Sequence, residues 1–239
     1  MTGAAPPTQR PSRGARWGLA QALGSMLGPR TSVAAGPLDA LQEPLHPTEA
    51  RAVRDAVPLR RREFTAGRTA ARRALAGLGL PGVGIAVRAD RSPAWPAGVV
   101  GSVTHTRGWC AAAVARTRDV RAMGVDAEPA EPLPAEVRHL VLTAREADAL
   151  LGAEAVPTEV LERLAFSVKE CVHKALQPLT GRSAGFLEVE VRLDPCTGRW
   201  AARTEAREWR RAVPGGLLRG RFCRHGPLWL TTLVLRAPR

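Results

Sequence analysis

The chain has 239 residues, enough for one large domain or for two domains of roughly 110 to 120 residues each. Its hydrophobic content of 45% is ordinary for a globular protein, and no apolar run approaches the roughly 18 residues of a spanning helix, which argues against a membrane protein. The net charge of +13 favours an anionic partner, but an aromatic content of 4% and the lack of a helix-turn-helix, zinc-finger or RNA-recognition signature argue against nucleic acid. A cofactor with several phosphates, or an acidic protein, accounts for the charge equally well.

The first 40 residues are rich in Arg, Pro and Gly, and the first acidic residue is Asp39. No apolar core with a cleavage site is present, which argues against a signal peptide. We expect residues 1–40 to form a flexible or loosely packed arm, although an organellar transit peptide is also acid-poor and Arg-rich. The four cysteines show no CxxC spacing and no dense framework, so we expect neither a zinc site nor a disulfide scaffold. A reducing cytoplasm fits this cysteine usage best.

The first lobe, expected at residues 41–118, begins with a helix. Apolar residues at i, i+3 and i+4 spacing predict this helix over 48–79, with Gly79 as its C-terminal stop. Residues 83–88 are typical of a strand, and the proline-rich segment 92–98 is typical of a loop. The remaining strands, which should form a hairpin, are predicted at 99–104 and 109–115.

The second lobe, expected at residues 119–239, begins with a strand over 121–128. The pattern Thr-Ala-Arg-Glu at 143–146 is a capping box and predicts the start of a short helix. A longer helix is predicted at about 158–176 and should end before Pro178. The remaining strands are predicted at 185–193, 199–204 and 228–236. Each half combines helices with an antiparallel sheet, so we expect an α+β fold of two similar lobes.

Only two of the 35 Lys and Arg residues are lysines, and both, Lys169 and Lys174, lie on the longer predicted helix. An Arg-biased composition erodes surface lysines, so a lysine that persists favours a site that needs a compact, flexible ammonium group. Glu170 precedes Lys174 by four residues and shares its helix face. Asp126 and Glu128 share one face of the predicted strand, about 6.6 Å apart. Separately, these could be water-facing charges and an i, i+4 ion pair; together, three carboxylates favour magnesium over zinc.

These residues belong to two motifs, Gly-Val-Asp-Ala-Glu-Pro at 124–129 and Lys-Glu-x-x-x-Lys-Ala at 169–175. The pair resembles the signature motifs of the 4′-phosphopantetheinyl transferases. Three further blocks, at 61–68, 95–105 and 178–186, extend the likeness. They are most similar to the long, single-chain (Sfp-type) branch of the family and to its enterobactin synthase component D group. The resemblance covers roughly residues 45–236.

The resemblance implies a pseudo-twofold fold with its active site in the cleft between the lobes. The implied reaction transfers the 4′-phosphopantetheine arm of coenzyme A to a serine of a carrier domain, with Mg²⁺, or Mn²⁺, as the cofactor. Asp126, Glu128 and Glu170 would hold the metal, and Glu170 and Lys174 would be catalytic. The residues implied to bind coenzyme A are Arg60, Arg68, Arg88, Thr104, His105, Lys169 and Lys174.

The implied partners are coenzyme A and the acidic carrier domains of fatty acid, polyketide or nonribosomal peptide synthases. We expect a cytoplasmic monomer that binds neither nucleic acid nor membrane. The sequence departs from the family pattern at several positions: Phe166 stands where Trp is frequent, His173 stands where Tyr or Phe is common, Thr104 replaces a usual Ser, and Ser183-Ala184 replaces an expected Trp-Leu pair. Two other hypotheses therefore remain, a non-catalytic relative that binds coenzyme A or a carrier domain, and a basic nucleic-acid-binding protein.

Overall fold

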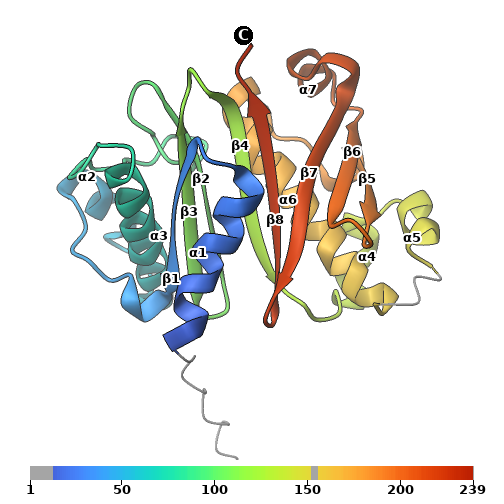
Figure 1. The fold of residues 1–239 in the computed structure, drawn as a ribbon, viewed down its shortest axis with the longest axis horizontal. Helices are drawn as coiled ribbons and strands as arrows, with labels where there is room; N and C mark the ends of the chain where they lie inside the picture. The colour runs from blue at the N-terminus through green and yellow to red at the C-terminus, as the bar shows by residue number, and fades with distance from the viewer. Residues whose placement is uncertain (1–12, 152–155, 239) are drawn as a thin grey trace, which may run out of the picture.

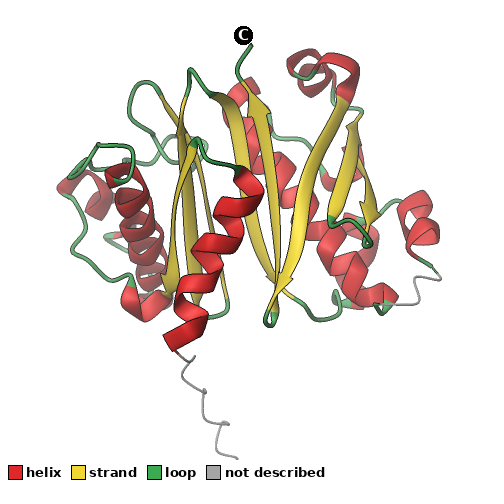
Figure 2. Cartoon of the chain, viewed as in Figure 1, coloured by secondary structure: helices red, strands yellow, loops and turns green. Residues whose placement is uncertain are grey.

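The computed structural model describes residues 13–151 and 156–238. Two antiparallel sheets form the framework, one with the strand order β1-β3-β2 and one with the order β4-β8-β7-β6-β5. Helices pack against both sheets (Figures 1 and 2), so the predicted α+β fold is confirmed. No helix in the described part of the chain is both long enough and apolar enough to cross a membrane.

The helices are α1 (Arg13–Leu27), α2 (Pro47–Ala50), α3 (Pro58–Ala76), α4 (Ala135–Val141), α5 (Ala144–Leu150), α6 (Thr158–Thr180) and α7 (Arg207–Ala212). Short 3-10 turns are η1 (Leu38–Ala40), η2 (Arg51–Val53), η3 (Phe186–Glu188) and η4 (Pro214–Gly216). The strands are β1 (Thr31–Pro37), β2 (Val99–Thr106), β3 (Trp109–Arg116), β4 (Val120–Pro129), β5 (Val189–Asp194), β6 (Arg199–Thr204), β7 (Leu217–His225) and β8 (Leu228–Arg236).

The N-terminal segment is not the loose arm that its composition suggested. From Arg13 onward it forms α1 and β1, and β1 pairs antiparallel with β3. Leu19, Leu23 and Leu27 recur at every fourth position and are buried against β3, β4 and β8. This apolar stripe ties α1 into the core, so the prediction was wrong for residues 13–40. Residues 1–12 of the predicted arm lie outside the described residues.

The helix predicted over 48–79 is divided into α2, η2 and α3, because Pro58 starts a new helix. A proline disfavours helical geometry at the residue before it, and Val57 is extended, with φ −59° and ψ 153°. The helix α3 ends at Ala76, before the predicted stop at Gly79. The predicted strand at 83–88 is absent from the described chain, where a single isolated bridge joins Val87 to Pro93.

From the first-lobe hairpin onward, several predicted elements are confirmed, and others differ from prediction. The hairpin of β2 and β3, the capping box of α5 and the strands β4, β6 and β8 are confirmed. The strand predicted at 185–193 begins only at Val189, after η3. The helix α6 continues through Pro178 to Thr180, and Gly181 caps it with φ 70°. Because only two helical residues follow Pro178, its missing N–H interrupts the helix only at its end. The elements α4, α7 and β7 were not predicted.

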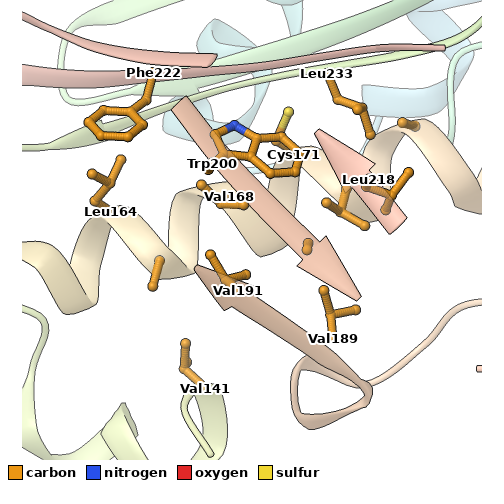
Figure 3. Packing of buried hydrophobic residues seen from close by; sticks show 14 of the residues in the cluster. Val141, Leu164, Val168, Cys171, Val189, Val191, Trp200, Leu218, Phe222 and Leu233 are labelled. Carbon is orange, nitrogen blue, oxygen red and sulfur yellow. The ribbon is translucent and has the colours of Figure 1, made fainter. Parts of the chain in front are cut away.

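The helix α6 is the centre of the second lobe. Leu164, Val168 and Cys171 point from it toward the five-stranded sheet, where they meet Trp200 and Val191 (Figure 3). In the first lobe, alternate residues of β3 face opposite sides of the smaller sheet, one covered by α1 and the other by α3. Each lobe therefore has its own packed core.

The two sheets meet along β2 and β4. The backbone N–H of Val125 donates to Oγ of Ser102 at 3.0 Å, and that of Ala127 donates to Oγ1 of Thr104 at 3.2 Å. Side-chain hydroxyls at alternate positions of β2 thus replace the backbone hydrogen bonds that an ordinary strand pair would form. We call this contact between β2 and β4 the seam. It fixes β4 against the first lobe on both sides of Asp126.

Candidate active site

Asp126 is the centre of the site and is 3% exposed. Its Oδ1 accepts hydrogen bonds from Oγ1 of Thr104 at 3.0 Å and from Nζ of Lys174 at 2.5 Å, and its Oδ2 accepts one from Oγ of Ser167 at 2.7 Å. Thr231, opposite Asp126 on β8, lies 3.0 Å from the Ser167 hydroxyl. Three elements, β2, α6 and β8, therefore converge on one carboxylate.

The approach of α6 to this carboxylate depends on Gly124, two residues earlier in β4. A Cβ atom built at this position would lie 2.0 Å from the backbone oxygen of Cys171. The glycine that begins the Gly-Val-Asp motif is thus required, because only a residue without a side chain allows this close contact between helix and strand. Cys171 is fully buried, and burial raises the pKa of its thiol.

Lys174 supplies the ammonium group of the site. Burial opposes its charge, but the charge and hydrogen bond of Asp126, together with the charges of Glu170 and Cys171, outweigh burial, and the pKa of Lys174 is raised. Its side chain keeps 26% exposure and lines a cavity between the lobes. Lys174 is therefore held in place, charged and open to an anionic ligand.

Glu128 and Glu170 lie near Asp126 and respond to its charge. Burial, reinforced by Asp126, raises the pKa of Glu128, although Oε2 of Glu128 accepts from Arg163 Nη1 at 3.1 Å. Burial also raises the pKa of Glu170; Lys174 opposes this shift and Asp126 adds to it. Both glutamates resist ionisation chiefly because they are buried, and the nearby charge of Asp126 adds to this effect.

The donor chemistry of this carboxylate group suits a hard divalent cation. The three side chains offer only oxygen donors, and a divalent ion would relieve the repulsion that raises the pKa of both glutamates. Across residues 13–151 and 156–238, however, no three His, Cys, Asp or Glu side chains are close enough together to form a metal-binding group. Asp126 is paired with the ammonium group of Lys174 in this structure. The three carboxylates therefore lie near one another without surrounding a common metal-binding position.

The first lobe contributes further cationic groups beside this centre. The guanidinium of Arg68 lies over the ring of Phe64, with 4.5 Å from Cζ to the ring centroid, and burial lowers the pKa of Arg68 to about 10. Its Nε finds no hydrogen-bond partner in the described chain. Arg60 contacts Glu63 at 4.0 Å. Desolvation lowers the pKa of His105, and the charges of Glu63 and Lys174 both act on its ring.

A cavity of about 200 Å³ lies between the two lobes next to Lys174. Arg88 and Trp95 line it from the first lobe, and Arg121 lines it from the start of β4. The indole of Trp95 is fixed by its Nε1–H, which donates to the backbone oxygen of Gly101 at 3.0 Å. The predicted residue Arg88 thus shares a cavity with Lys174.

Two predicted coenzyme A contacts take other roles. Lys169 is 1% exposed, and its Nζ donates to the backbone oxygens of Val141 at 2.7 Å and Phe186 at 3.1 Å and to Oε2 of Glu146 at 2.7 Å. Its three N–H groups are all used inside the second lobe, so the prediction that Lys169 binds phosphate was wrong. The Thr104 hydroxyl binds β4 and Asp126 in place of a ligand.

Sequence reasoning missed Ser167, Arg163 and Glu146, which position predicted site residues. Ser167 and Arg163 lie within one turn of Glu170 and Phe166 on α6, so helix periodicity offered a signal for them. Glu146 had been assigned only to its capping box, yet it also accepts from Lys169 and, at 2.7 Å, from the backbone N–H of Val191.

The departures at His173 and Ser183 lie beside the C-terminal part of α6. The ring of His173 contacts Trp209 edge-on, with centroids 5.9 Å apart. The indole Nε1–H of Trp209 donates to the backbone oxygen of Arg182 at 3.1 Å, which ties the segment after α6 to α7. Ser183 is exposed. An aromatic contact made by α7 thus lies next to the position where the family has a Trp-Leu pair.

Comparisons with known proteins agree with this arrangement. A model of the 4′-phosphopantetheinyl transferase N-terminal domain matches residues 48–115, and a model of the 4′-phosphopantetheinyl transferase superfamily matches residues 122–220. The chain is 44% identical over 178 residues to 4′-phosphopantetheinyl transferase Svp of Streptomyces mobaraensis, covering 74% of this chain and 70% of that protein. It is 36% identical over 196 residues to PptT of Mycobacterium tuberculosis, covering 79% and 85%.

The predicted likeness to the component D group is also confirmed. Enterobactin synthase component D of Salmonella typhi is 34% identical over 128 residues, which cover 52% of this chain and 51% of that protein. The first matched segment contains β2, and the second contains most of β4 and all of α6. The two segments therefore lie on opposite sides of the seam between β2 and β4, near Asp126 and Lys174. The chain therefore belongs to the 4′-phosphopantetheinyl transferase superfamily.

Proposed function

We propose that the protein transfers the 4′-phosphopantetheine moiety of coenzyme A to a serine of an apo carrier protein and releases adenosine 3′,5′-bisphosphate. The observation that carries this proposal is the grouping of Asp126, Glu170 and Lys174 at the seam between the lobes, inside the segment that the superfamily model matches. Carboxylates and an accessible ammonium at one point suit a reaction that moves a phosphoryl group and a proton.

The first lobe would bind the phosphates of coenzyme A. The buried guanidinium of Arg68, with an unused Nε–H, is preorganised for a phosphate oxygen. Arg60 and His105 lie in the same electrostatic neighbourhood, and Arg88 lines the cavity beside Lys174. Because a neutral imidazole donates one N–H while an imidazolium donates two, phosphate binding would favour protonation of His105.

Asp126, Glu128 and Glu170 would hold Mg²⁺, or Mn²⁺, which neutralises charge on the diphosphate. Binding at Asp126 Oδ1 requires Lys174 to exchange that carboxylate for an oxygen of the substrate. The 26% exposure of its side chain and the flexibility of a lysine chain allow this exchange. Ser167 and Thr231 would keep Asp126 in place meanwhile.

Glu170 would act as the general base. Its raised pKa makes it a better proton acceptor than an exposed glutamate. The carrier serine oxygen would bond to the phosphorus attached to pantetheine, the bond from that phosphorus to the oxygen of the 5′-phosphate would break, and the serine proton would pass to Glu170. Lys174 would stabilise negative charge on the departing phosphate.

The carrier partners would be acidic domains of fatty acid, polyketide or nonribosomal peptide synthases, including siderophore assembly, in the cytoplasm. The basic composition of the chain suits such partners. We propose a monomer, because a single chain supplies both sides of the seam, and we propose neither nucleic acid nor membrane as a partner for catalysis.

The test is transfer itself. Wild-type protein, coenzyme A, Mg²⁺ and an apo carrier domain are incubated, and the carrier is examined by mass spectrometry for one added phosphopantetheine arm. Asp126→Ala and Glu170→Ala should abolish the addition, whereas Glu159→Ala, an exposed glutamate on the same helix, should leave it unchanged. Coenzyme A binding without transfer to any of several carriers would favour a non-catalytic relative.

A further inference from the structure

The outward face of β5, β6 and β7 carries a group of arginines far from the seam. Residues alternate along these strands: Trp200, Leu218 and Phe222 point inward to the core around α6, and their neighbours point outward. We call the outward group the arginine face. Its members, all exposed, are Arg192, Arg199, Arg203, Arg219 and Arg221.

The strand register places these charges next to one another. Arg199 lies directly opposite Arg221, and Arg219 lies opposite Ala201, between Arg199 and Arg203 on β6. Neighbouring strands are about 4.8 Å apart, and like charges at such a distance destabilise a sheet. The arrangement therefore offers no benefit to the fold itself.

Close ion pairs are few on the arginine face, although the register of β5 with β6 places Asp194 opposite Arg199 and Glu190 opposite Arg203. Among the described residues, only Arg192 has an acidic group within 4.0 Å, Glu190 at 3.8 Å. Arg221 makes only a long contact of 3.5 Å to the backbone oxygen of Ser25. Charged residues often protect the edges of sheets, but β6 and β7 are interior strands and need no such protection.

The face is uncovered and hollowed. The helix α1 packs over β8 and the neighbouring side of β7, and Figure 1 shows α6 behind the sheet, on the opposite face. Two open hollows lie among the arginines, one of about 250 Å³ that includes Arg192 and Arg203 and one of about 270 Å³ that includes Arg199 and Arg219. Asp126 contacts Ser167 and Lys174 of α6 on the other side, so a partner at this face leaves the seam free.

We propose that the arginine face is a second docking surface, which binds an acidic segment of a protein partner outside the catalytic cleft. Arginine pairs with carboxylates through two parallel hydrogen bonds. In an extended acidic peptide, carboxylates two residues apart lie about 6.6 Å from each other, which matches the spacing of Arg219 and Arg221 along β7. Sheet surfaces that bind single-stranded nucleic acid present aromatic rings for stacking, but the tryptophan of this region, Trp200, is turned inward and is 2% exposed.

The test compares binding of labelled poly-L-glutamate to wild-type protein and to two matched triple variants by fluorescence anisotropy at low salt. The variant Arg199→Gln, Arg203→Gln, Arg219→Gln should bind about tenfold more weakly. The control variant Arg51→Gln, Arg54→Gln, Arg118→Gln removes three exposed arginines of the first lobe and should change affinity by less than about twofold. Carrier modification on an isolated carrier domain should be unchanged in the face variant, and an unshifted melting temperature would show that its fold is intact.

Equal weakening by both triple variants would overturn the proposal, because general charge would then explain binding. Displacement of the polymer by coenzyme A would also overturn it, since the polymer would then occupy the catalytic cleft. A DNA duplex of equal charge that binds more tightly than poly-L-glutamate, through these same arginines, would assign the face to nucleic acid instead.

Discussion

Replacing Lys169 by methionine tests whether this lysine stabilises the fold or binds coenzyme A. In the wild-type protein its side chain is 0% exposed, Glu146 is 1% exposed, and the Nζ–Oε2 distance is 2.7 Å. Removing one partner of a buried pair typically costs about 3–5 kcal/mol, because the other charge remains buried. Glu146 would retain donors from the Thr143 backbone, the Thr143 hydroxyl and the Val191 backbone. We therefore expect a loss near the lower limit, about 3 kcal/mol.

Urea unfolding followed by tryptophan fluorescence measures this loss. With a denaturant dependence of about 3 kcal/mol per molar, the unfolding midpoint should fall by about 1 M. Adding Glu146→Gln to Lys169→Met should recover about 1–2 kcal/mol, because the uncompensated charge is removed while the carbonyl oxygen of the amide can still accept from Val191. The Michaelis constant for coenzyme A should change little in the protein that remains folded.

Lys174→Met is the matched contrast. It should abolish transfer while lowering stability by only about 1–2 kcal/mol, since Asp126 keeps the Ser167 and Thr104 hydroxyls. A stability loss below about 1 kcal/mol for Lys169→Met, together with a tenfold or greater rise in the Michaelis constant for coenzyme A, would refute the structural role of Lys169.

Four further outcomes are expected. Gly124→Ala should unfold the protein or lower its stability by several kcal/mol, because the added Cβ would lie 2.0 Å from the Cys171 backbone oxygen. A thermal melt measures this loss, and a melting temperature near that of the wild type would contradict the contact. A thiol reagent should modify exposed Cys196 first and leave Cys110 protected, since burial raises the pKa of Cys110 to about 12. Fast modification of two or more thiols would contradict this order of reactivity. In protein stripped of divalent ions, the folded state binds the Glu170 proton more tightly than the unfolded state, so the free energy of unfolding should decrease as the pH rises through the raised pKa. Glu170→Gln should make that decrease smaller in pH-dependent urea titrations, and the part caused by the raised pKa of Glu128 should remain. Arg221→Gln should raise stability by about 0.2–1 kcal/mol by relieving repulsion with Arg199, since the opposite neighbour of Arg221 on β8 is the uncharged Thr232, and a loss of stability would count against the like-charge argument.

Helix and strand periodicity predicted which side chains share a face. Glu170 and Lys174 are four residues apart on α6, and Asp126 and Glu128 alternate with apolar neighbours on one strand, so each pair followed from local geometry. The meeting of the strand with the helix was implied by the resemblance to the family. Lys169 was wrongly assigned to coenzyme A binding. Lysine is scarce in this chain, and that scarcity pointed to Lys169 and Lys174 equally. Successive helix residues differ by about 100°, so Lys169 points away from Glu170 and into the second lobe.

The contacts that cross the seam could not be predicted, because they depend on how two sheets meet. Nothing local in Thr104 shows that its hydroxyl bonds to β4. The N-terminal helix was missed for a different reason: its Arg, Pro and Gly content dominated the interpretation, although Leu19, Leu23 and Leu27 already formed a helical stripe. The break at Pro58 was also visible in the sequence and should have divided the predicted helix.

The most direct test of the catalytic centre is the position of a manganese ion, located by its anomalous scattering in crystals grown with coenzyme A and Mn²⁺. The account predicts one strong peak bound by Asp126, Glu128 and Glu170, with the diphosphate of coenzyme A beside it and Lys174 turned toward a phosphate oxygen. A peak away from these carboxylates, or a diphosphate bound at another surface while Lys174 still holds Asp126, would contradict it.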